Sequence, residues 1–171
     1  MKFRSLIAIA AFTFMSVAVS AQEWTVNKIM DSVTVLMPGT AKQTEKNGQV
    51  GHELRLNDST KYSFLYINFE DFGLNEEALG QMVDTDEFAE QYKMGISQQG
   101  EIVSEKKGKL DDKYTYFEYE MKIDENGVKK TGFIRTTFYK AYGIATVYSP
   151  GQKGTDAANR DKYFNSLKIG K

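Results

Sequence analysis

The chain holds a single histidine, His52, which is its only residue suited to act as the general base of a hydrolase triad. It lies in or beside a predicted strand, next to Glu53 and Arg55. A triad histidine is held by an acid and faces a nucleophile, and the sequence lacks the G-x-S-x-G motif that presents a nucleophilic serine. We therefore interpret His52 as an ordinary strand residue and predict no catalytic residue.

Carboxylates are concentrated between residues 70 and 90. Two of them at the proper separation would perform glycoside hydrolysis. Helix starts also favour Asp and Glu because of the helix dipole, and several of these acids lie where helices are predicted to begin. We therefore favour helix capping and a solvated helix face, and keep a carboxylate-dependent hydrolase as a remote alternative. The acids are Glu70, Asp71, Glu76, Glu77, Asp84, Asp86, Glu87 and Glu90.

Motifs for metals and cofactors are weak or missing. One histidine and no cysteine exclude the usual zinc sites, thiolate nucleophiles, iron–sulfur clusters and disulfides. Asp124-x-Asn126-Gly127 matches a fragment of an EF-hand loop, but that loop needs ligands well beyond this point, where two lysines follow instead. Neither Gly-rich phosphate motif occurs. We expect no metal and no cofactor, and predict a hairpin turn with Gly127 in the left-handed conformation.

Tyr114 and Tyr116 alternate along a predicted strand and are the candidate ligand contacts. An exposed tyrosine ring can stack on a sugar, although tyrosines of this kind more often pack beneath a helix. The pair supports, as an alternative function, a small-ligand or glycan-binding module that uses exposed tyrosines.

The first 21 residues have the parts of a secretory signal peptide. Lys2 and Arg4 precede an apolar stretch, Leu6–Val19, which ends in short residues. The stretch is shorter than the roughly 20 residues that a helix needs to cross a bilayer. We predict cleavage between Ala21 and Gln22, a periplasmic or secreted protein, and no stable membrane insertion after cleavage.

Residues 22–171 have the size of one ordinary domain with a single sizeable core. Loss of Lys2 and Arg4 leaves 20 basic residues against 23 acidic ones, a formal net charge of −3. A weakly acidic chain has no general attraction for nucleic acid. We therefore expect no nucleic-acid partner.

Alternation predicts strands, and apolar stripes at the helical period predict helices. We expect a helical turn in residues 22–31 and hairpin turns at Asn47-Gly48 and 124–127. Two helical pieces, or one kinked helix, are expected over 75–99 with a cap at Asp84-Thr85, and Thr155 is expected to cap a last helix. The predicted strands span 32–37, 49–56, 61–69, 101–107, 114–123, 128–140 and 144–148, and the last helix spans 156–167.

The segment 61–69 decides the predicted architecture, because it is apolar on both faces. Tyr62, Phe64 and Tyr66 alternate with Leu65 and Ile67. A strand with one wet face would alternate apolar with polar residues. We therefore predict an α+β fold: a mainly antiparallel, twisted β-sheet with helices on both faces.

Two sequence patterns resemble those of a known family. The segment M-P-G-x-A-K at Met37–Lys42 and the segment Y-F-N-S-L-K-I at Tyr163–Ile169 are similar to the first strand end and the terminal helix of small secreted PsbP-like proteins, of the Mog/PsbP-like superfamily. Met37, Ala41 and Leu167 depart from the family pattern. The resemblance implies one PsbP-like domain over 22–171, an α/β/α sandwich.

The same resemblance implies an accessory or binding role, since the better-known relatives assist a photosystem or bind a GTPase and are not enzymes. It transfers no functional residue and gives no support for photosynthesis. We therefore expect an exported, non-catalytic accessory or binding protein of the bacterial cell envelope. It would act through contact with another envelope or secreted protein, whose identity the sequence does not give.

Overall fold

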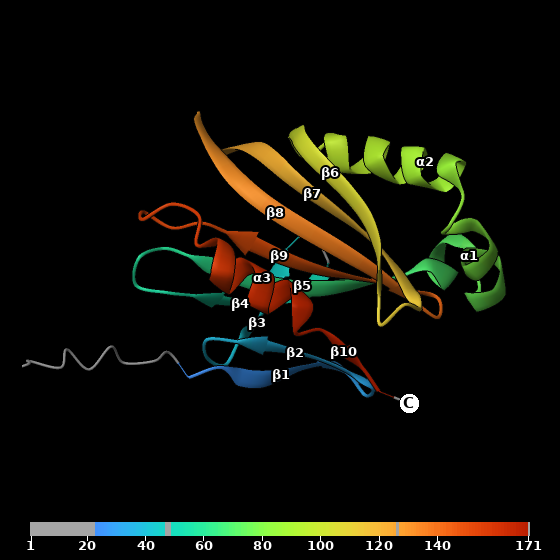
Figure 1. Cartoon of the computed structure of the whole chain (residues 1–171), viewed down its shortest axis with the longest axis horizontal. Helices are drawn as coiled ribbons and strands as arrows, with labels where there is room; N and C mark the ends of the chain where they lie inside the picture. Colours follow the sequence, from blue (N-terminus) through green and yellow to red (C-terminus); the bar gives the residue numbers. More distant parts are fainter. Residues whose placement is uncertain (1–22, 47–48, 126, 171) are drawn as a thin grey trace, which may run out of the picture.

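The computed structural model describes residues 23–46, 49–125 and 127–170, and its centre is a seven-stranded antiparallel sheet. The strands lie in the order β3-β4-β5-β9-β8-β7-β6 (Figure 1). The predicted cleavage site at Ala21 and Gln22 and the turn residues Asn47-Gly48 lie outside the described residues. The strands are β3 (Lys42–Lys46), β4 (Gln49–Arg55), β5 (Lys61–Asn68), β6 (Glu101–Leu110), β7 (Tyr114–Glu125), β8 (Val128–Tyr139) and β9 (Tyr142–Ser149).

A second antiparallel sheet joins the first described residues to the last ones. It has the order β1-β2-β10, formed by β1 (Thr25–Met30), β2 (Val33–Met37) and β10 (Lys168–Ile169). The prediction of a helical turn in residues 22–31 is wrong. The segment TVNKIM buries every second residue at Asn27 and Ile29, and its backbone pairs with β2.

The helices begin at residues whose side chains cap them. Asn75, Thr85 and Asp156 each accept a hydrogen bond from a backbone N–H of the first turn that follows. This confirms the helix break at Asp84-Thr85, whereas the last helix is capped by Asp156 and not by Thr155. Within the described ranges, none of the helices has the length and apolar character to span a bilayer. The helices are a 3-10 turn (Phe69–Phe72), α1 (Glu76–Met82), α2 (Asp86–Ser97) and α3 (Ala157–Asn165).

One face of the large sheet, which we call the α3 face, packs against α3 and the small sheet (Figure 1). Tyr163 and Phe164 of α3 are fully buried there, and the Tyr163 hydroxyl donates to the Ser63 carbonyl at 2.6 Å. Side chains of three layers therefore meet in one cluster. It comprises Ile29, Val33, Val35, Met37, Tyr62, Phe64, Phe133, Ile144, Tyr148, Tyr163, Phe164 and Leu167.

The opposite face, the α2 face, packs against α1 and α2. The Tyr92 hydroxyl of α2 donates to the hydroxyl of Thr136 at 2.7 Å, which ties the helix to β8. Helices on both faces of an antiparallel sheet confirm the fold class predicted from the sequence. The cluster on this face comprises Leu79, Val83, Phe88, Ile96, Phe117, Tyr119, Met121, Ile134 and Phe138.

The two layers lie over different halves of the sheet. Within the large sheet, the α2-face cluster takes its buried residues from β7 and β8, whereas the α3-face cluster takes them from β5, β8 and β9. Phe64 is therefore 2% exposed, whereas Leu65, on the α2 face of β5, is only half-buried. Both faces of residues 61–69 were predicted to be covered, and the structure corrects this on both: Leu65 of the α2 face is only half-buried, and Tyr66 of the α3 face is exposed.

The β7–β8 hairpin confirms the predicted conformation of Gly127. Its φ is 79°, in the left-handed region that glycine adopts without steric cost. The Gly127 N–H donates to the Asp124 carboxylate at 2.7 Å. Asn126 of the predicted turn lies outside the described residues.

Candidate functional site

Four tyrosines form a row on the α3 face, near the strand ends opposite the β7–β8 hairpin. Tyr66, Tyr142, Tyr139 and Tyr114 come from the adjacent strands β5, β9, β8 and β7. The Tyr66 and Tyr142 ring centroids are 5.9 Å apart, and those of Tyr114 and Tyr139 are 5.4 Å apart, both pairs edge to face. Tyr139 and Tyr142 are direct partners in the β8–β9 ladder. We call these residues the tyrosine row.

The tyrosine row is partly open to solvent. Tyr66 is 45% exposed and the other three rings are half-buried. The hydroxyl of Tyr139 lies 3.4 Å from the Ser32 hydroxyl, so this ring also contacts the small sheet. Tyrosine combines a large apolar area with a polar hydroxyl. It therefore suits a surface that is exposed to water in the free protein and buried in a complex.

Two lysines lie over rings of the tyrosine row. The ammonium of Lys113 is 4.8 Å from the Tyr114 ring centroid, and that of Lys140 is 5.3 Å from the Tyr139 ring centroid. Both distances are within the range of cation–π attraction. The contacts place positive charge beside the aromatic surface.

Tight turns position these lysines. Lys113 follows Asp111 and Asp112, whose φ values of 52° and 55°, with the Lys113 N–H donating to the Leu110 carbonyl, are those of a type I′ turn. Lys140 has a φ of 52° in the β8–β9 turn. A lysine in this left-handed region carries a steric cost of about 1–2 kcal/mol that glycine avoids.

A hollow of about 220 Å³ lies on the α2 face, at the same end of the sheet as the tyrosine row, between α1 and the two turns. Sites for drug-sized ligands usually measure about 300–1,000 Å³. The hollow therefore fits one large side chain better than a complete small molecule. Its lining consists of Glu76, Leu79, Gly80, Val83, Asp84, Lys113, Tyr114, Thr115, Phe138 and Lys140.

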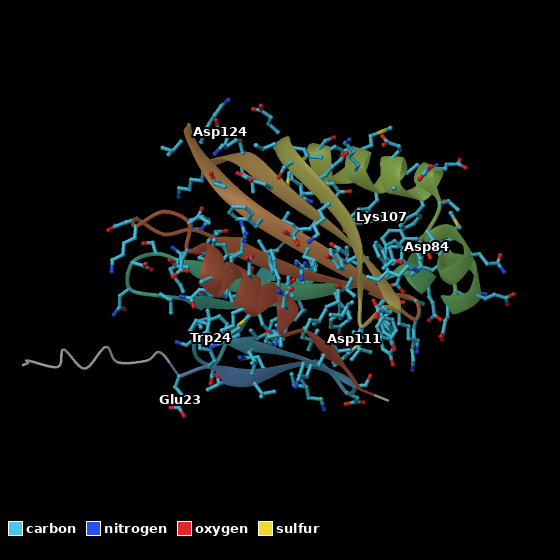
Figure 2. The ribbon with its side chains drawn as sticks, viewed as in Figure 1. Glu23, Trp24, Asp84, Lys107, Asp111 and Asp124 are labelled. Atoms are coloured by element: carbon cyan, nitrogen blue, oxygen red, sulfur yellow. The ribbon has the colours of Figure 1, made fainter. Side chains whose placement is uncertain are left out.

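Asp84, in the wall of the hollow, is held by three neighbours. Its carboxylate accepts hydrogen bonds from the Thr115 hydroxyl and, at 2.9 Å, from Lys109, and its backbone carbonyl accepts one from Lys107 at 2.8 Å. Figure 2 shows Asp84 and Lys107 close together at the end of α1. Hydrogen bonds from Thr115 and Lys109 lower the pKa of Asp84 below its ordinary value. Asp84 therefore stays ionised and joins the α1–α2 connection to β6 and β7.

Six of the other seven acids of residues 70–90 are explained by helix starts, and Glu90 lies on the exposed side of α2. Six lie in first turns: Glu70 and Asp71 in the 3-10 turn, and the Glu76-Glu77 and Asp86-Glu87 pairs in α1 and α2. These positions confirm the capping interpretation. Across the described ranges, no group of three or more His, Asp and Glu side chains is arranged to hold a metal ion.

His52 lies on the α3 face of β4. Its ring stacks on Phe64, with centroids 4.8 Å apart and planes 15° from parallel. Within the parts of the chain that the structure describes, the imidazole has no hydrogen-bonding partner. This surrounding is that of the ordinary strand residue expected from the sequence.

Tyr116 does not offer the exposed ring that was inferred from the sequence. It is 9% exposed, and the Arg135 guanidinium lies 4.5 Å from its ring centroid. Gly108 is the direct partner of Tyr116 on the neighbouring strand β6. A Cβ at Gly108 would lie only 2.5 Å from the Tyr116 ring, so the ring packs across this glycine. Of the predicted ligand contacts, only Tyr114 lines a hollow. As a ligand contact it remains a prediction.

Sequence reasoning missed the rest of the site. Tyr66, Tyr139 and Tyr142 lie far apart in the chain, and only the strand order β5-β9-β8-β7 brings them together with Tyr114. The available signal was a tyrosine near the end of each strand, which becomes informative once the pairing is known.

Comparison with known proteins identifies the fold. No family model and no curated protein matches the chain. The solution structure of cyanobacterial PsbP (CyanoP) from Synechocystis sp. PCC 6803 is 14% identical, with a TM-score of 0.54, and the match covers 89% of this chain and 95% of that one. A crystal structure from Bacteroides thetaiotaomicron is 10% identical, with a TM-score of 0.48, covering 82% and 46%. The chain therefore has a PsbP-like fold.

Proposed function

We propose that the chain is an exported, non-catalytic accessory protein that acts by binding another protein through the tyrosine row. The observation that carries the proposal is the row itself, which spans four strands and is partly open to solvent. Tyrosine is enriched in protein interfaces and in their energetic hot spots. The PsbP-like fold supports an accessory role, because the sequence resemblance to that family implies one.

A small-ligand or glycan-binding module is the second candidate. Tyr114 is half-buried and is one of the residues that line the hollow. The small volume of the hollow ranks this function below protein binding. We do not propose a hydrolase, because the acids of residues 70–90 have structural partners or helix-start positions, except for Glu90 on the exposed side of α2.

Export is tested by the mass of the mature protein. When the full chain is produced in an exporting bacterial host, we expect a protein that begins at Gln22, because the short residues before it suit signal peptidase. Intact-mass spectrometry of the envelope and secreted fractions measures this start. An envelope-bound chain that retains Met1 would contradict the export proposal.

Binding is tested by site-specific photo-crosslinking in the native organism. A benzoylphenylalanine in place of Tyr66 or Tyr142 is expected to crosslink to the same protein, because both rings lie in the row. Val128 is the matched control, since it is 57% exposed and begins β8 at the opposite end of the sheet. No adduct from either tyrosine position, or the same adducts from Val128, would overturn the proposal.

A further inference from the structure

The outward sides of α1 and α2 form an unpartnered helix face that is strongly acidic. We call residues 69–97, which contain the 3-10 turn, α1 and α2, the helical layer. The helical layer holds eight acids and one base, Lys93, a formal charge of −7. The rest of residues 22–171 holds 19 bases and 15 acids, a formal charge of +4. The negative charge of the chain is therefore gathered in the layer that covers the α2 face.

Helix starts explain where most of these acids lie, but they do not explain the missing bases. A solvated helix commonly carries lysine or arginine one turn after an acid, where the opposite charges stabilise the helix. Here the last turns of α1 and α2 contain no base. The residues four positions after each acid of α1 and α2 are all uncharged or acidic. They are Gly80, Gln81, Glu90, Gln91 and Met94.

Within the described ranges, only two residues of the helical layer form ion pairs. Asp84 pairs with Lys109, and Lys93 pairs with Glu105. Where another carboxylate of the layer accepts a hydrogen bond from a side chain, the donor is a neutral amide, as when Gln91 donates to Glu87. Seven carboxylates of the described layer are therefore available to a cationic partner.

The helical layer also exposes large apolar side chains among its acids. Phe72 is 73% exposed and directly follows Glu70 and Asp71 in the 3-10 turn. Met94 is 65% exposed on α2, one turn after Glu90. Aromatic residues and methionine are enriched in protein interfaces, and the flexible methionine side chain adapts to the surface of a partner. The layer therefore offers apolar contacts as well as charge.

The charge of the layer selects the chemistry of its occupant. Seven unpaired carboxylates repel nucleic acid and anionic lipid, and they attract a cationic surface. Arginine suits this surface best, because its guanidinium pairs with carboxylates through two hydrogen bonds and also stacks on an aromatic ring such as Phe72.

We propose that the helical layer is a second docking surface, which receives a basic segment of a protein partner in which arginines alternate with apolar side chains. The arginines would pair with the carboxylates, and the apolar side chains would pack on Phe72 and Met94. This surface goes beyond the proposed function, because the tyrosine row lies on the α3 face. Complementary charge would also speed the encounter with the partner.

The test titrates the mature protein with capped peptides and follows its backbone amides by NMR. The probes are Gly-Arg-Leu-Arg-Leu-Arg-Gly, a counterpart with Ser in place of Leu, and a counterpart with Asp in place of Arg. We expect saturable shifts at Gly73, Gly80 and Gly95 with the Arg-Leu peptide, weaker binding of the Arg-Ser peptide and no binding of the Asp peptide. Added salt should weaken the binding, because it screens exposed charges.

Charge variants locate the contact on the helical layer. Glu87→Gln/Glu90→Gln removes two exposed charges from α2, and Glu23→Gln/Glu45→Gln removes two exposed charges elsewhere, so both variants have the same net charge. Because each exposed ion pair changes an affinity by roughly 1.4- to fivefold, the α2 variant should bind the Arg-Leu peptide roughly two- to thirtyfold more weakly. The control should bind it as the parent protein does.

Apolar variants test the second element of the surface. Phe72→Ser and Met94→Ser should each weaken binding of the Arg-Leu peptide and leave that of the Arg-Ser peptide unchanged. Val26→Ser is the matched control, since Val26 is 69% exposed on β1. All three positions are exposed, so the urea midpoints of unfolding should stay close to that of the parent protein.

Several outcomes would overturn the second docking surface. These are equal affinity for the three peptides, no binding of the Arg-Leu peptide at millimolar concentration, and equal losses in the Glu87→Gln/Glu90→Gln and Glu23→Gln/Glu45→Gln variants, which would assign the effect to net charge alone. Dimers in analytical ultracentrifugation that Glu87→Gln/Glu90→Gln dissociates would make the occupant a second copy of the chain, and would also overturn the proposal. Crosslinking from the tyrosine row decides the proposed function independently of these results.

Discussion

Replacement of Arg135 by alanine is expected to lower the free energy of unfolding by about 3–5 kcal/mol, because it leaves the partner carboxylate without its countercharge in a largely buried place. Arg135 is 6% exposed, and its Nε donates to Glu118 at 2.7 Å. A second N–H donates to the Asn165 side chain of α3 at 2.9 Å. The guanidinium also lies between the rings of Tyr116 and Phe164.

The matched control for Arg135→Ala is Arg55→Ala. Arg55 pairs with Glu53 on the surface at 3.5 Å, and its side chain is 59% exposed. Exposed pairs of this kind contribute at most about 1 kcal/mol. Urea unfolding measures both variants, and equal losses would contradict a special role for the buried pair.

A double variant tests the reason for the loss. Arg135→Met/Glu118→Leu removes both charges and replaces them with apolar side chains. Because it leaves no unpaired charge, it should be more stable than Arg135→Ala. A double variant that is less stable than the single one would place the effect in packing of the Arg135 side chain, and not in charge.

Phe64→Ala is expected to cost about 3–5 kcal/mol, and Leu65→Ala distinctly less than the 2–5 typical of a buried leucine. The two residues are neighbours on β5, so they share their backbone surroundings and differ in the face to which they point. Phe64 contributes to the α3-face cluster and stacks on His52, whereas Leu65 is half-buried. Unfolding in urea gives both values. Equal losses would show that the α2 face is as well covered at β5 as the α3 face.

Local patterns predicted the elements of the large sheet well. Alternation identified β5, β7 and β8, and the Gly127 turn and the Thr85 cap followed from the conformations that these residues prefer. These signals depend on residues close together in the chain. Asp156 caps the last helix in place of the predicted Thr155. The backbone N–H of Asp156 also donates to the buried Tyr148 hydroxyl, and this tertiary contact fixes the start of the helix.

The unpredicted parts depend on contacts between distant segments. β1 and β10 are short, and each becomes a strand by pairing with β2. How deeply the α2 face of β5 is buried depends on the position of α2 over the sheet. The amphipathic pattern of α2 does not specify that position. The tyrosine row and its lysines likewise required the strand order, and Tyr116 was misjudged because Gly108, on a neighbouring strand, makes room for its ring.

The offset of the two layers has a consequence for how the native state opens. The α2-face and α3-face clusters contain different side chains, and β8 is the strand that contributes buried residues to both. Such an arrangement divides a domain into two cooperative units, or foldons, with separate opening free energies. Amides of β8, which both units protect, would exchange with solvent most slowly. The α1–α2 unit would be able to detach while α3 and the small sheet keep their half of the sheet folded.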